Sequence, residues 1–231
     1  MRNSPIKAIV WDLDGTLIHF KIDWLRARRE TIKILKKHGV PKHLLTVKSS
    51  ILENIRLARE YFGKAGYTNE ETEKIIKIVD NVVNDIEYEA ALEATAVNGI
   101  DKVLEFIKKK NLKQAIYTFN THRNATTSLE KIGMIGYFNI IIGRDDVKNT
   151  KPHPEHLTLI CNKLNVKPSD IIVIGDNHRD IEGALNVGAK SIALKTKLTK
   201  LTNLKILEKA DKIIEESEIP AKLIHAIEDF L

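Results

Sequence analysis

The stretch AIVWDLDGTLI, residues 8–18, places two aspartates directly after a run of apolar residues. The run is typical of a buried strand, whereas aspartate is a poor strand former and neighbouring buried carboxylates repel each other. Asp12 and Asp14, followed at once by Gly15 and Thr16, therefore indicate a site in which another group neutralises their charge. Two such carboxylates can divide the work of a group transfer, because one can attack while the other moves a proton.

Polar side chains also follow three later apolar runs, namely KQAIY, YFNIII and IIVIG. They are Thr118 and Asn120 after the first run, Lys151 beyond the second, and Asp176 and Asp180 after the third. Open α/β sheets bind ligands outside the carboxyl ends of their strands. We therefore expect these side chains to meet Asp12 and Asp14 at one rim of a single sheet.

The residue types at this rim define the chemistry. Four carboxylates without a cluster of thiols favour Mg²⁺ over zinc, and the single Cys161 is predicted to lie in the core. A lysine, a hydroxyl and the backbone N–H groups around Gly15 can bind the oxygens of a phosphate. This layout is expected for phosphoryl transfer through an aspartyl-phosphate, with a small phosphorylated metabolite as the substrate.

The elements that must position these residues alternate between helices and short apolar strands from about residue 96 onward. Such alternation predicts an α/β core with a parallel sheet covered by helices on both faces. We expect helices over 99–110, 123–132, 154–164, 179–187 and 219–230, and an edge strand in ADKII near the end. Between the first strand and this core, apolar stripes predict helices over 24–38 and 44–62 and a third from Thr68, where Glu71 completes a capping box.

Composition places further bounds on the function. The 231 residues carry a net charge of +6, but the basic residues are scattered, so we expect no nucleic-acid partner. No apolar run approaches the roughly 20 residues of a membrane span, and the first residues lack the features of a signal peptide. The expectation is a cytoplasmic protein without a membrane partner, working as a monomer or homodimer.

Four motifs in this order and spacing resemble those of the haloacid dehalogenase-like hydrolase superfamily. They are DLDGT (12–16), Thr118 at a strand end, KPHP (151–154) and GDNHRD (175–180). The chain looks like the phosphatase branch with a small helical (C1-type) cap, similar to phosphoglycolate phosphatase. The resemblance implies a Rossmann-like core domain over 1–18 and 96–231, with the first strand central, and an all-helical cap domain over 19–95.

The resemblance also implies a role for each motif residue. Asp12 is the nucleophile and a ligand of Mg²⁺, and Asp14 is the general acid/base, with its backbone carbonyl on the metal. Asp176 is the strongest candidate for a further metal ligand, and Asp180 acts directly or through water. Thr118 and Lys151 are catalytic residues, and the groups that bind the substrate phosphate are Leu13, Gly15, Thr118, Phe119, Asn120 and Lys151.

Phe119 departs from the family pattern, because many members have Asn or Gly directly after the threonine of the second motif. A role of Phe119 in shaping the substrate pocket is one expectation from this change. Asp14 favours a phosphatase over a 2-haloacid dehalogenase, since a leaving alkoxide needs a proton and a halide does not. The same motifs also fit a phosphomutase of the β-phosphoglucomutase type, and the fold alone would fit a non-catalytic binding or regulatory module.

Overall fold

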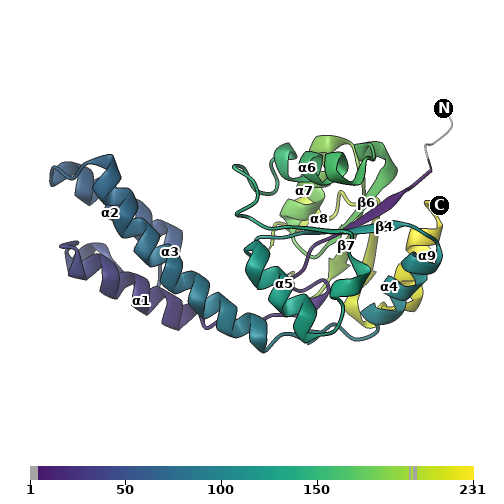
Figure 1. Cartoon of the computed structure of the whole chain (residues 1–231), viewed down its shortest axis with the longest axis horizontal. Helices are drawn as coiled ribbons and strands as arrows, with labels where there is room; N and C mark the ends of the chain where they lie inside the picture. Colours follow the sequence, from purple (N-terminus) through teal and green to yellow (C-terminus); the bar gives the residue numbers. More distant parts are fainter. Residues whose placement is uncertain (1–4, 198, 200–201) are drawn as a thin grey trace. The chain divides into compact units, whose positions relative to one another are not determined.

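Strand β1 (Ala8–Trp11) lies in the middle of a six-stranded sheet in which every strand is parallel to its neighbours (Figure 1). The computed structural model describes residues 5–197, 199 and 202–231. Across the sheet the order is β5 (Ile140–Ile142), β4 (Lys113–Tyr117), β1, β6 (Ile171–Gly175), β7 (Lys190–Lys195) and β8 (Lys212–Glu215). The predicted α/β fold with a parallel sheet is confirmed, as is the edge strand near the end of the chain.

Helices cover both faces of the sheet because successive side chains of a strand point to opposite sides. Ile9 and Trp11 of β1 belong to a core that also contains residues of α4 (Ile100–Lys109), α5 (His122–Lys131) and α9 (Ala221–Glu228). Ala8 and Val10 belong to a second core with α6 (Pro154–Leu164) and α7 (His178–Val187) (Figure 1). The buried Cys161 lies in this second core, as predicted.

Two short strands were not predicted. β2 (Ile18–His19) and β3 (Thr95–Ala96) pair antiparallel, which brings together segments that are far apart in the chain. Strands of two residues are too short to carry the alternating apolar pattern by which strands are predicted. Further short elements among the described residues of the core are α8 (Leu204–Leu207) and the 3-10 helices at Ile135–Tyr137, Pro168–Asp170 and Glu216–Glu218.

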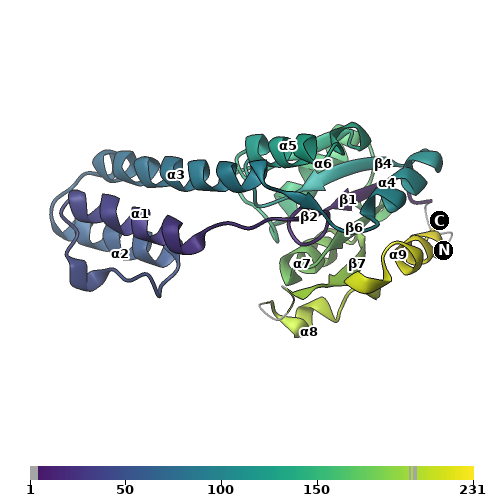
Figure 2. The ribbon, with the colours of Figure 1, turned by 90° about the horizontal axis from the view of Figure 1, so that it is seen from below.

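The chain divides into two compact units, one of Met1–Phe20 with Ala91–Leu231 and the other of Lys21–Ala90. The second unit contains α1 (Trp24–Lys37), a 3-10 helix at Lys42–Leu44, α2 (Ile51–Lys64) and most of α3 (Asn69–Leu92). In it, Leu35 of α1, Phe62 of α2 and Val79 of α3 share one apolar core. Figure 2 shows the course of these three helices. The assignment of this segment as a cap domain stays a prediction. None of the described helices combines the length and apolar composition that a bilayer crossing requires.

The helix predicted over 44–62 begins later, at Ile51. Ser50 caps α2 by accepting a hydrogen bond from the backbone N–H of Glu53. The buried amide of Asn54 donates to the carbonyl oxygens of Thr46 and Ser50, and its oxygen accepts from the N–H of Thr46. These bonds hold the preceding segment in a turn, so that part of the prediction was wrong. The capping box of Thr68 and Glu71 is confirmed.

His156 on α6 gives the folded protein a pH dependence that can be measured. The side chain is fully buried, its Nε2 lies 3.0 Å from the carbonyl oxygen of Ile142, and its ring packs edge-on against Tyr117. Burial lowers the pKa of His156 from 6.5 to about 4. Between these two values the unfolded chain holds more protons than the folded one, so the contribution of this residue to stability decreases as the pH falls.

We expect the wild type to lose about 1 kcal/mol of unfolding free energy relative to His156→Gln between about pH 7.5 and about pH 5.5. Glutamine can still donate to the carbonyl of Ile142 but does not titrate. Urea unfolding of both proteins at several pH values measures the difference, in which the titration of all other groups cancels. Parallel curves for the two proteins would contradict the assignment.

Candidate active site

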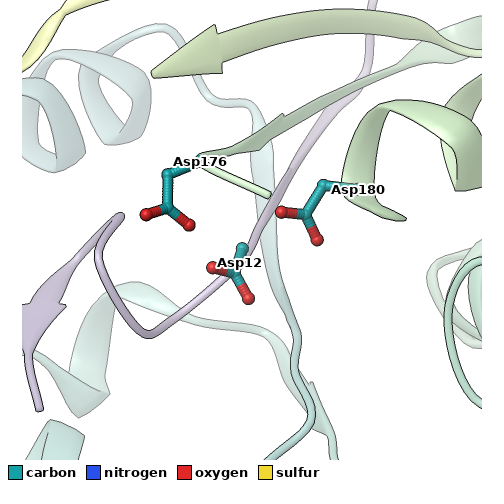
Figure 3. A group of neighbouring side chains, drawn as sticks. All are labelled: Asp12, Asp176 and Asp180. Atoms are coloured by element: carbon teal, nitrogen blue, oxygen red, sulfur yellow. The ribbon is translucent and has the colours of Figure 1, made fainter. Parts of the chain in front are cut away.

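Three aspartates from two strands and a helix converge at the carboxyl end of the sheet. Asp12 follows β1, Asp176 follows β6, and Asp180 lies in the first turn of α7, with their carboxylates turned toward one another (Figure 3). All three are buried, and one oxygen of each lies within 4.8 Å of the others. The sequence placed these residues at one rim, and the fold brings their carboxylate oxygens into one group.

Lys151 supplies the positive charge in this group. Its Nζ lies 2.5 Å from Oδ1 of Asp12 and 2.7 Å from Oδ1 of Asp180, and it donates to the carbonyl oxygen of Tyr117 at 2.9 Å. Burial acts to lower the pKa of Lys151, but attraction to Asp12 and Asp180 outweighs it and raises this pKa above its ordinary value. Lys151 is therefore a cation at neutral pH. Its two ion pairs link Asp12 of the first motif to Asp180 of the fourth motif.

Negative charge remains in excess. Three carboxylates against one ammonium leave two negative charges when all are ionised. Burial and the charges of Asp12 and Asp180 raise the pKa of Asp176 to about 8. Burial, opposed in part by Lys151, raises that of Asp180 to about 7. A hard divalent cation fits this donor set of buried carboxylate oxygens, since it would compensate the excess charge in place of protons.

Asp14 is not part of the group that could hold a metal through carboxylate oxygens. Its carboxylate accepts two hydrogen bonds from Nδ2 of Asn120, at 3.0 Å to Oδ1 and 2.9 Å to Oδ2. The two aspartates of the first motif therefore lie in different surroundings, Asp12 against a lysine and Asp14 against an amide. The metal contact predicted for the backbone carbonyl of Asp14 stays a prediction.

Two glycines let the carboxylates come this close to the backbone. Gly15 has φ of +80°, and a Cβ atom built on it would lie 2.3 Å from Oδ2 of Asp176. A Cβ atom on Gly175 would lie at the same distance from Oδ2 of Asp180. Position 15 thus requires glycine because of its positive φ and because no Cβ atom fits there. Position 175 requires glycine because no Cβ atom fits there.

The other residues predicted to bind phosphate differ in the contacts that they make. Thr118 is buried at the end of β4, and its Oγ1 accepts from the backbone N–H of Asn120 at 3.1 Å. The side chain of Leu13 packs in the core, so only its backbone can contribute to a phosphate site. The ring of Phe119 lies near two cations, with its centroid 5.1 Å from Nζ of Lys151 and 5.4 Å from Cζ of Arg179.

The sequence-based prediction missed residues of the site, among them Thr196 and Tyr117. Thr196 donates from Oγ1 to Oδ2 of Asp176 at 2.9 Å, and the ring centroid of Tyr117 lies 4.7 Å from Nζ of Lys151. Thr196 directly follows β7, so the rule that polar residues at strand ends share a rim could have found it. Tyr117 belongs to an apolar strand, and no feature of the sequence distinguishes it from a core residue.

Comparison with known proteins indicates a family for this chain. Residues 9–194 match the model of the haloacid dehalogenase-like hydrolases. An N-acetylmuramic acid 6-phosphate phosphatase of Pseudomonas putida is 26% identical over 192 residues, which are 82% of this chain and 83% of that protein. A phosphoglycolate phosphatase of Salmonella typhimurium is 27% identical over 190 residues, or 81% of this chain and 66% of that protein.

Solved structures agree on the fold. A β-phosphoglucomutase of Clostridium difficile matches with a TM-score of 0.66 at 22% identity, covering 96% of each chain. The relatives with similar sequences are named phosphatases, and the matched segment spans the first, second, third and fourth motifs. This chain therefore belongs to the haloacid dehalogenase-like hydrolases.

Proposed function

We propose that this protein is a Mg²⁺-dependent phosphatase that hydrolyses a small phosphorylated metabolite through an aspartyl-phosphate. The observation that carries the proposal is the buried group of Asp12, Asp176 and Asp180, paired with Lys151 at the carboxyl end of the sheet. Its relatives support the same reaction, since relatives that match 82%, 84% and 81% of this chain are named phosphatases.

In the proposed reaction a carboxylate oxygen of Asp12 attacks phosphorus, and the bond from phosphorus to the ester oxygen breaks. Lys151 holds Asp12 and offsets charge on the phosphoryl oxygens, while the hydroxyl of Thr118 and the backbone N–H groups of Leu13 and Phe119 bind those oxygens. Asp14 gives its proton to the departing alkoxide. In the second half, Asp14 takes a proton from water as the water attacks the aspartyl-phosphate, which releases phosphate and restores the carboxylate of Asp12 and the protonated form of Asp14.

A divalent cation is the expected partner of this chemistry. Mg²⁺ would be held by Asp12, Asp176 and Asp180, together with the backbone carbonyl of Asp14, and would supply positive charge to the substrate phosphate. Mg²⁺ is proposed over Zn²⁺ because every side-chain donor is a carboxylate. Thr196 orients Asp176 for this role through its hydroxyl.

Competing functions have less support. A phosphomutase is not favoured, because the relatives with similar sequences are phosphatases and the mutase structure shares the fold alone. Asp14 argues against a dehalogenase, and the intact set of carboxylates argues against a binding module. The physiological metabolite, a cytoplasmic location and the state of monomer or homodimer stay predictions.

The first test removes the nucleophile. Asp12→Asn is expected to reduce phosphate release from 4-nitrophenyl phosphate by about 1,000-fold or more, because an amide cannot attack phosphorus. Circular dichroism should show an unchanged fold. Asp101→Asn, on the exposed first turn of α4, serves as the matched control and should retain activity. Turnover of Asp12→Asn near that of the wild type would exclude the mechanism.

The second test concerns the metal. EDTA is expected to abolish phosphate release, and added Mg²⁺ should restore it. Independently of activity, Mg²⁺ should raise the thermal unfolding midpoint of the EDTA-treated protein, because it binds the folded state alone. Asp176→Asn should lose this rise, whereas Asp101→Asn should keep it. Equal shifts in both variants would place the cation elsewhere.

A further inference from the structure

The contact of Asn120 with Asp14 depends on the amide NH₂ group of the asparagine. One amide nitrogen lies 3.0 and 2.9 Å from the two oxygens of the same carboxylate. Only the NH₂ end of an asparagine can face a carboxylate at these distances, since the carbonyl end would bring oxygen against oxygen. Asn120 is itself 3% exposed, so this contact is made by a side chain fixed inside the protein.

The backbone of Asn120 is held from two sides. Its N–H donates to Oγ1 of Thr118 at 3.1 Å, and its carbonyl oxygen accepts from the N–H of Arg144 at 2.9 Å. The second bond needs Gly143, where a Cβ atom would lie 2.8 Å from that carbonyl oxygen. Asn120 is thus fastened to the ends of both β4 and β5 before its side chain reaches Asp14.

We propose that Asn120 is a positioning residue that orients Asp14 toward the departing oxygen. The inference rests on the proposed phosphatase function and extends it to a residue beside the second motif. Both its amide nitrogen and its backbone N–H are engaged within the protein, on Asp14 and Thr118 respectively. The insertion of Phe119 between Thr118 and Asn120 moves the asparagine one position along, and in this place it contacts the proton donor.

If Asn120 positions Asp14, the effect of losing Asn120 on the rate of ester cleavage should depend on the leaving group. When the bond from phosphorus to the ester oxygen breaks, its electron pair stays on that oxygen, which takes the proton of Asp14. An alkoxide is too basic to leave without this proton, whereas 4-nitrophenolate can leave as the anion. A misplaced Asp14 should therefore slow the cleavage of alkyl phosphates much more than that of 4-nitrophenyl phosphate.

The experiment compares kcat/KM for glycerol 2-phosphate and 4-nitrophenyl phosphate in the Mg²⁺-loaded enzyme. This ratio reports the steps up to phosphorylation of Asp12, and so leaves out the hydrolysis of the aspartyl-phosphate that both substrates share. Asn120→Ala should lower kcat/KM about 100-fold for the alkyl ester but only about 5-fold or less for the aryl ester. Asn120→Asp, of nearly the same shape, should behave alike, because its carboxylate cannot donate a hydrogen bond to Asp14.

Asn124→Ala is the matched control, a buried asparagine on α5 whose amide nitrogen has no hydrogen-bond partner among the described residues. Its ratio of the two kcat/KM values should equal that of the wild type. Equal losses on both substrates in Asn120→Ala, or no loss on either, would overturn the positioning role. A wild type that releases phosphate from neither ester would instead contradict the proposed function, so the two failures can be told apart.

Discussion

The excess of negative charge in one buried group is the constraint on which the site depends. Asp12, Asp176 and Asp180 lie within reach of a single cation, and Lys151 neutralises only part of their charge. Such a group is costly to fold, because burial favours the neutral form of each carboxylate and repulsion adds to that cost. The arrangement suits a site that binds a divalent cation beside the phosphate of a substrate, since the cation and Lys151 together would offset the three carboxylates.

This constraint explains the surrounding architecture. Parallel strands end at one rim, so β1 and β6 deliver Asp12 and Asp176 side by side, and the start of α7 adds Asp180. Glycines at 15 and 175 leave the space that these carboxylates need near the backbone. Asp14, two residues beyond Asp12, lies outside this group, and its carboxylate accepts from the amide of Asn120. The proposed nucleophile and the proposed proton carrier thus lie in different surroundings although they are close in the sequence.

Much of the fold could be predicted from the sequence because its signals are local. Runs such as IIVIG predict buried parallel strands, and the alternation with helices predicts the sheet that is found. The start of α3 follows from Thr68 and Glu71, which interact within one turn of helix. The start of α2 could not be predicted in this way, because it depends on how the amide of Asn54 binds the backbone of Thr46. The pairing of β2 with β3 likewise joins residues about 75 positions apart, for which no local pattern exists.

The sequence by itself determined which chemical groups stand at the strand ends: the carboxylates, Lys151 and Thr118, in an order typical of one hydrolase family. It could do so because residue type and position along a strand are both written in the chain. Only the tertiary structure decided which atoms meet. The bond of Asn120 to Asp14 spans 106 positions, and that of Thr196 to Asp176 joins the ends of two strands. Such contacts depend on strand register and loop conformation, which the packing of the whole sheet determines.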